Sequence, residues 1–248
     1  MKRIFTGFAM CQSMFCAIPF PGNLWDEKAR DHMLLFLPLV GLEIGLIWYL
    51  GWTLAAALEL TKAVTAVLMT ALPYMLTGYI HLDGFMDVTD AVKSCRDLEK
   101  RRMILKDPHV GSFAVIGCVM LMLCQFSFFM GLENGAGILI LVPAVSRCCS
   151  ALAIKLLKPM STSQYAHQEK AGFPVYWLIG ILAVCIAMGF VCCGLSGAAL
   201  LGCMLGSGVS IFSGYRNLEG MNGDISGYAI TIGEVWAVAT LVLMGGLL

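Results

Sequence analysis

The stretch 111–131, GSFAVIGCVMLMLCQFSFFMG, contains no Asp, Glu, Lys or Arg. It is long enough to cross the hydrocarbon core of a bilayer, which takes about 20 apolar residues in a helix. Further apolar runs of comparable length lie at 33–51, 59–80, 135–157, 174–194, 196–213 and 229–248. Since a helix satisfies its own backbone polar groups in lipid, these runs predict an all-α, polytopic integral membrane helical bundle. We expect about seven transmembrane helices in a single domain, 1–248.

The composition of the whole chain agrees with this prediction. Of its 248 residues 59% are apolar and 13% are charged, and the mean hydropathy is +0.82. Soluble domains carry about 25% charged residues, and disordered chains need low hydrophobicity, so both classes are excluded. The net charge is zero, which argues against a nucleic-acid partner. The cysteines form no C-x-x-C pair, and we interpret them as apolar packing residues.

The basic residues indicate which side of the membrane carries the chemistry. They concentrate in the segments 1–32, 81–110, 158–173 and 214–228, whereas the opposite connections are short and almost uncharged. The positive-inside rule places these four segments in the cytoplasm. In the first segment, Lys2 and Arg3 precede the moderately apolar stretch Ile4–Phe20. We interpret it as a retained interfacial helix, because polar residues interrupt it and no A-x-A cleavage site follows.

The segment 81–110 carries a group of carboxylates and is predicted to be the catalytic loop. Asp83, Asp87 and Asp90 have the spacing i, i+4 and i+7, so on a helix they share one face. Carboxylates so close together favour a bound cation, and hard oxygen ligands select Mg²⁺, Mn²⁺ or Ca²⁺. Mg²⁺ commonly completes its shell with phosphate oxygens, which points to a pyrophosphate substrate. His81 is a candidate proton acceptor.

Other charged and polar residues extend this hypothesis. Arg101, Arg102 and Lys106 follow the aspartates and are candidates for phosphate binding. In the glycine-rich segment 214–228, predicted as a second cytoplasmic site loop, Asp224 is a further candidate metal ligand. Charges within the apolar runs are functional candidates by default. Arg147 is one of them, and either Glu43 or Glu234 is its candidate partner if it forms an ion pair.

Two stretches, HLDGFMDVTDAV at 81–92 and RRMILKDPHVGSFAV at 101–115, strongly resemble the cobalamin synthase family, the adenosylcobinamide-GDP ribazoletransferases. Ser146-Arg147 and the late element at 220–224, GMNGD, also match that family, although Met221-Asn222 stands where it more often has Ile-Thr. The resemblance implies transfer from adenosylcobinamide-GDP to α-ribazole, or its 5′-phosphate, with release of GMP. It also implies a Mg²⁺ requirement and a site in the bacterial cytoplasmic (inner) membrane with its active face toward the cytoplasm.

On this resemblance each candidate residue receives a role. The residues expected to be catalytic are His81, Asp83, Asp87 and Asp90. The expected metal ligands are Asp83, Asp87, Asp90 and Asp224. The residues expected to bind substrate or phosphate are Arg101, Arg102, Lys106, Arg147, Asn222 and Asp224.

Two alternative functions remain at this stage. A CDP-alcohol phosphotransferase acting on a lipid also places spaced aspartates at the end of a span, but its pattern has Ala-Arg after Asp-Gly, where this chain has Phe85-Met86. A small secondary transporter would use the charges within the spans, yet the sequence shows no convincing internal repeat. Membrane lipid is an expected partner. The glycine pairs Gly41/Gly45 and Gly202/Gly206 allow a homo-oligomer.

Overall fold

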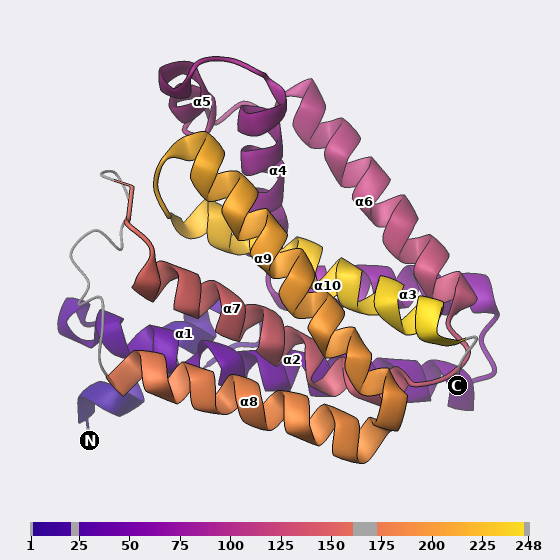
Figure 1. Cartoon of the computed structure of the whole chain (residues 1–248). Helices are drawn as coiled ribbons and strands as arrows, with labels where there is room; N and C mark the ends of the chain where they lie inside the picture. Colours follow the sequence, from indigo (N-terminus) through magenta and orange to yellow (C-terminus); the bar gives the residue numbers. More distant parts are fainter. Residues whose placement is uncertain (1, 21–24, 161–172, 246–248) are drawn as a thin grey trace.

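The computed structural model describes residues 2–20, 25–160 and 173–245, and it is built from helices (Figure 1). In chain order the α-helices are α1 Lys2–Phe15, α2 Arg30–Ala57, α3 Lys62–Leu76, α4 Ile80–Lys93, α5 Leu98–Ile104, α6 Ser112–Gly131, α7 Val142–Leu156, α8 Phe173–Cys193, α9 Ala198–Leu218 and α10 Gly223–Met244. Short 3₁₀ helices lie at Glu27–Ala29, Ala136–Ile140 and Gly194–Gly197. The predicted all-α class is confirmed.

Five helical stretches are long and apolar enough to cross a membrane: His32–Ala57, Ser112–Gly131, Ala136–Leu156, Pro174–Leu218 and Gly223–Met244. A sixth is present if α3 and α4 form one broken span. By this criterion the described residues give five or six spans where the sequence predicts about seven, because α8 and α9 are counted together as one stretch of 45 residues. The runs 174–194 and 196–213, predicted as two spans, belong to the single stretch 174–218, which the 3₁₀ turn Gly194–Gly197 interrupts.

The run 59–80 is not one continuous helix. It breaks after Leu76, and the axes of α3 and α4 differ by 93°. Gly78 and Tyr79 have φ values of +58° and +64°, and left-handed residues cannot continue a right-handed helix. Apolar composition alone does not reveal such a break. Helix α4, which carries the three aspartates, has 14 residues and is too short to cross a bilayer by itself.

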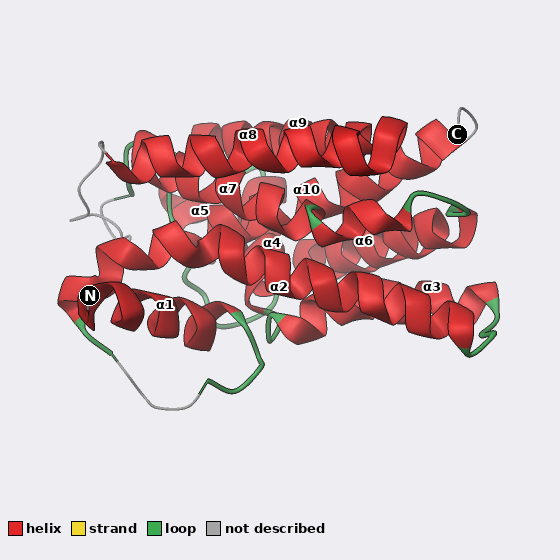
Figure 2. Cartoon of the chain, turned by 90° about the horizontal axis from the view of Figure 1, so that it is seen from below, coloured by secondary structure: helices red, strands yellow, loops and turns green. Residues whose placement is uncertain are grey.

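The bundle is layered, with α8 and α9 along one side, α7 and α10 in the middle, and α1 and α3 along the other side (Figure 2). Both glycine pairs named above pack within the chain. A Cβ at Gly41 or Gly45 would meet the backbone of Pro143 or Ile140, and one at Gly206 would meet Trp236. These glycines thus permit close helix contacts inside the molecule, so they do not by themselves indicate a multimer.

The middle of the bundle contains a buried ion pair. The guanidinium of Arg147 on α7 lies 2.7 Å from the carboxylate of Glu234 on α10, and both side chains are almost fully buried. Ser146 donates a hydrogen bond to the same carboxylate at 3.0 Å. Glu43 instead accepts a hydrogen bond from Gln12 of α1 at 2.7 Å. Glu234, and not Glu43, is therefore the partner of Arg147.

The predicted loop 214–228 is much shorter than expected. Helix α9 continues to Leu218, and α10 begins at Gly223, so only residues 219–222 connect them. Glu219 ends α9 with a φ of +50°, and the side chain of Asn222 caps α10 by accepting a hydrogen bond from the Ile225 amide at 3.0 Å. Of the glycines that suggested a loop, Gly214 and Gly227 lie in helices and permit close contacts with Ile225 and His81, whereas Gly220 lies in the connection.

Candidate active site at the crossing of α4 and α10

Helix α4 presents the aspartates as their spacing predicted. Asp83 is exposed, while Asp87 and Asp90 are half-buried. The opposite face of α4 is buried and includes Leu82, Phe85 and Val88. The helix is therefore amphipathic: its apolar face packs on the bundle, and its acidic face is left accessible.

Two glycines allow α4 and α10 to touch. A Cβ on Gly84 would lie 2.8 Å from the carbonyl oxygen of Asp224, and one on Gly227 would lie 2.9 Å from that of His81. The hydroxyl of Thr231 also donates to the His81 carbonyl at 3.2 Å. This close crossing brings Asp224 to the acidic face of α4, although 134 residues separate it from Asp90 in the sequence.

The carboxylates at this crossing act on one another. Partial burial, and then the negative charges of Asp83, Asp224 and Asp90, raise the pKa of Asp87 to about 6. Asp224 accepts a hydrogen bond from the Asn222 side chain at 2.6 Å. Since Asn222 also caps α10, the same residue fixes the start of the helix and orients the carboxylate. Asp83, Asp87 and Asp224 thus form one electrostatic group, which we call the acidic cluster.

Asp90 has a different environment. Its carboxylate accepts a hydrogen bond from the Ala114 amide at 3.4 Å, and a Cβ on Gly111 would clash with its oxygens. An acidic group at the first turn of a helix is stabilising. In this arrangement Asp90 holds the start of α6 against α4, and its predicted role as a metal ligand stays a prediction.

The acidic cluster provides carboxylate oxygens as donors for a divalent cation. In the part of the chain that the structure describes, no three His, Cys, Asp or Glu side chains converge closely enough to enclose a metal ion. Mg²⁺, however, commonly takes one or two carboxylates and completes its shell with water and phosphate. The acidic cluster offers such hard oxygen donors on an accessible face, so its residues fit a Mg²⁺ ion that keeps open coordination positions.

His81 lies beneath the acidic cluster, not within it. Its ring is 5% exposed and stacks on Phe15 of α1, with the centroids 5.8 Å apart. Its Nε2 has no hydrogen-bond partner among the described residues. The predicted role as proton acceptor stays a prediction, and this geometry gives His81 a packing contact between α1 and α4.

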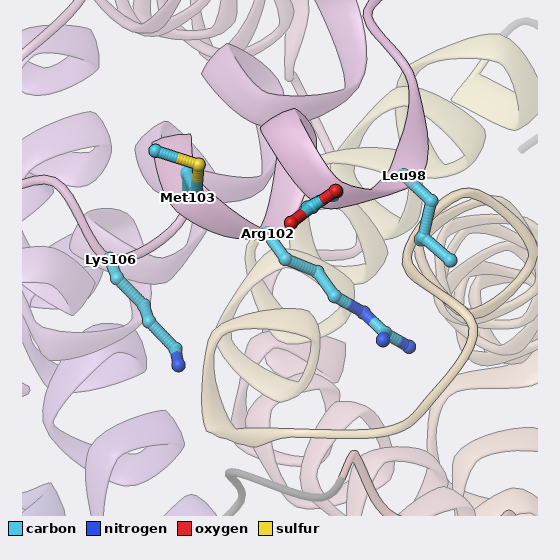
Figure 3. Close-up of a pocket in the computed structure, with 5 residues that line it drawn as sticks. Leu98, Arg102, Met103 and Lys106 are labelled. Atoms are coloured by element: carbon cyan, nitrogen blue, oxygen red, sulfur yellow. The ribbon is translucent and has the colours of Figure 1, made fainter.

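The three basic residues predicted to bind phosphate have different surroundings: the two arginines bond to the end of α9 and its cap, and Lys106 lines a pocket. Arg101 donates to the Asn217 side chain at 2.7 Å, and Arg102 donates to the carbonyls of Leu218 and Glu219 at 3.0 Å each. These bonds tie α5 to the connection that leads to Asp224, a contact that the sequence did not reveal. Lys106 lines a pocket of about 380 Å³ together with Arg102 (Figure 3).

Arg147 is engaged inside the bundle. Besides Glu234, it donates to the Pro143 carbonyl at 3.0 Å, and its side chain is 1% exposed. Its Nε has no partner among the described residues. The structure thus assigns Arg147 an interhelical contact, and its predicted contact with substrate stays a prediction.

Comparison with known proteins decides the family. The cobalamin-5-phosphate synthase family matches residues 7–242. The chain belongs to the cobalamin-5-phosphate synthase family. Its relatives include proteins named adenosylcobinamide-GDP ribazoletransferase from Clostridium perfringens, Clostridium botulinum and Geobacillus kaustophilus. The first is 34% identical over 97% of this chain and 99% of the relative, the second 32% over 95% and 96%, and the third 26% over 98% of each. No solved structure matches.

Family membership confirms the resemblance found in the sequence, and it makes the chain a transferase of cobalamin biosynthesis. The helices that are long and apolar enough to cross a membrane agree with an integral membrane member of this family. Sequence reasoning missed one feature of the site. A hollow beside Asp83 is formed by the end of α1 and the break between α3 and α4, and the sequence signal for that break is Gly78 within the apolar run 59–80.

Proposed function

We propose that this chain carries out the reaction of its family at the acidic cluster. The chain is an adenosylcobinamide-GDP ribazoletransferase, which acts in the nucleotide-loop assembly step of cobalamin biosynthesis. The observation that carries the proposed location is the α4–α10 crossing, because it unites Asp83, Asp87 and Asp224 on an accessible face. A pyrophosphate substrate needs charge neutralisation and positioning more than covalent catalysis.

In the proposed reaction a free ribose hydroxyl of α-ribazole, or of its 5′-phosphate, attacks the phosphorus that is attached to cobinamide, and a 5′-phosphate on the acceptor is retained in the product. One P–O bond forms to the acceptor and one P–O bond to GMP breaks. With either acceptor the attacking ribose hydroxyl gives up one proton.

The residues of the acidic cluster have different proposed roles. Asp87 and Asp224 are proposed to hold Mg²⁺, with Asn222 keeping the Asp224 carboxylate in place through its hydrogen bond. Mg²⁺ neutralises pyrophosphate charge and polarises the phosphorus under attack when it is bound. Asp83 is the exposed member of the cluster, and we propose that its carboxylate accepts the hydroxyl proton.

The cations are proposed to act on the donor nucleotide. Lys106 and Arg102 line one pocket, and a Lys or Arg near phosphate oxygens offsets charge on the leaving GMP. Arg101 supports this arrangement by fixing α5 to Asn217 of α9.

We also propose that this face of the protein is cytoplasmic and that the membrane is the bacterial inner membrane. Support comes from the basic residues of α5 and its flanks, which the positive-inside rule assigns to the cytoplasm. The bacterial origin of the relatives agrees with this location. A membrane-embedded platform suits a large amphipathic corrinoid substrate.

The proposal is tested by measuring GMP release. Purified protein in lipid is supplied with adenosylcobinamide-GDP and either α-ribazole or its 5′-phosphate, with Mg²⁺ or with a chelator. We expect release only when metal and acceptor are both present. Release that requires neither would contradict the proposed reaction, and release with CDP-linked alcohols in place of the corrinoid would favour the phosphotransferase alternative.

A further inference from the structure

A hollow lies beside the acidic cluster on the side of α1. Its volume is about 490 Å³, which is within the range of small-molecule sites. The end of α1 forms one wall and the α3–α4 break forms the other, and Asp83, which is exposed, is among the residues that line it. Residues that line it include Ser13, Met14, Ala17, Tyr79, Ile80 and Asp83.

The charge of this hollow differs from that of the pockets on α5. No Lys or Arg is among the described residues that line it, whereas Arg102 and Lys106 line the pocket on α5. A phosphate-rich ligand would therefore find no cation among these lining residues. The walls suit a ligand part that is uncharged, partly apolar and able to present a hydroxyl to Asp83.

Tyr79 is an aromatic residue that lines the hollow and has an unfavourable backbone conformation. It begins α4 in the left-handed region with a φ of +64°, directly after Gly78, and it is 54% exposed. A bulky residue in this region is strained, and an exposed ring contributes little to the core. A glycine would adopt this backbone more easily, so the backbone conformation does not require an aromatic side chain at this position. An exposed aromatic face suits stacking on a nucleobase.

We propose that this hollow binds the nucleoside part of the acceptor, with its base on the ring of Tyr79 and its ribose toward Asp83. The inference rests on the proposed function and names Tyr79 as a specificity-determining residue for it. The corrinoid and the GDP part of the donor then lie outside this hollow, on the side of α5. The two substrates thus reach the acidic cluster from different directions.

The test compares Tyr79→Gly and Tyr79→Phe with a matched control. Tyr79→Gly removes the ring and also relieves the backbone, so it should not lower the thermal stability. We expect it to raise the KM for α-ribazole about tenfold, in keeping with the loss of one base–aromatic stack, while the KM for adenosylcobinamide-GDP stays the same. Tyr79→Phe keeps the stacking face and should leave both KM values near those of the parent.

The control is Glu59→Gly, which makes the same backbone change at another left-handed residue, with a φ of +52°, on the connection between α2 and α3. It should change neither KM. An unchanged acceptor KM in Tyr79→Gly overturns the inference, and so does an equal rise in both KM values. If the parent protein releases no GMP, that result contradicts the proposed function but leaves the binding site to be tested. Equilibrium binding of α-ribazole without donor then replaces the KM, with the same comparison of parent and variants.

Discussion

The buried pair Arg147–Glu234 provides the sharpest test of the fold. We consider Glu234→Leu, which replaces the carboxylate by an apolar side chain and leaves the guanidinium in place. Arg147 is 1% exposed and would keep only its bond to the Pro143 carbonyl and a weak contact with Ser146. Breaking a buried pair by removing one partner costs about 3–5 kcal/mol. Because so little of Arg147 reaches solvent, we expect a loss of unfolding free energy within this range.

Two companion variants give the expected order. Glu234→Gln keeps an oxygen that can accept from Arg147, so it should cost less, about 1–3 kcal/mol. In the double variant Arg147→Met with Glu234→Leu no charge is buried, and such replacements are often neutral or stabilising. We therefore expect the double variant to recover most of the stability that Glu234→Leu loses.

Unfolding by rising SDS in mixed micelles, followed by circular dichroism, measures these differences. The control is Lys62→Met, which removes an ion pair with Glu133 that is 3.5 Å long and exposed at both ends. It should change the stability by only about 0.5 kcal/mol. The reasoning is refuted if Glu234→Leu stays within about 1 kcal/mol of the parent, or if the double variant is no more stable than Glu234→Leu.

Three further predictions concern the site and its orientation. Gly84→Ala should push α4 from α10, lower the unfolding free energy by about 1–3 kcal/mol and lower GMP release at least tenfold. The control is Gly180→Ala, which should be neutral because a Cβ there meets nothing within 4 Å. Equal behaviour of the two variants would argue against the crossing as the site. Asp87→Asn should nearly abolish turnover while the protein still inserts and keeps its circular dichroism spectrum, and near-normal activity would remove Asp87 from the metal site. Cys95 is exposed on the connection after α4, so a membrane-impermeant maleimide should label it in inside-out vesicles only. Cys95→Ser is the control. Labelling of Cys95 in right-side-out vesicles would reverse the proposed orientation.

Several features could be predicted from the sequence because they depend on local properties of the chain. The run 111–131 became α6 over Ser112–Gly131, since uninterrupted apolar residues in a bilayer must form a helix. The spacing of Asp83, Asp87 and Asp90 predicted one helical face, and α4 provides it. Both inferences use only residues that are neighbours along the chain.

The tertiary structure decided which distant residues meet. The bend between α3 and α4 depends on backbone angles at Gly78 and Tyr79, and hydropathy does not report these. Glu234, and not Glu43, pairs with Arg147 because α7 packs beside α10 where these two residues lie. Asp224 joins the acidic cluster because Gly84 lets two helices approach, and Arg102 turned out to hold the end of α9. Periodicity determines the faces of each helix in this protein, but only side-chain packing determines which faces come into contact.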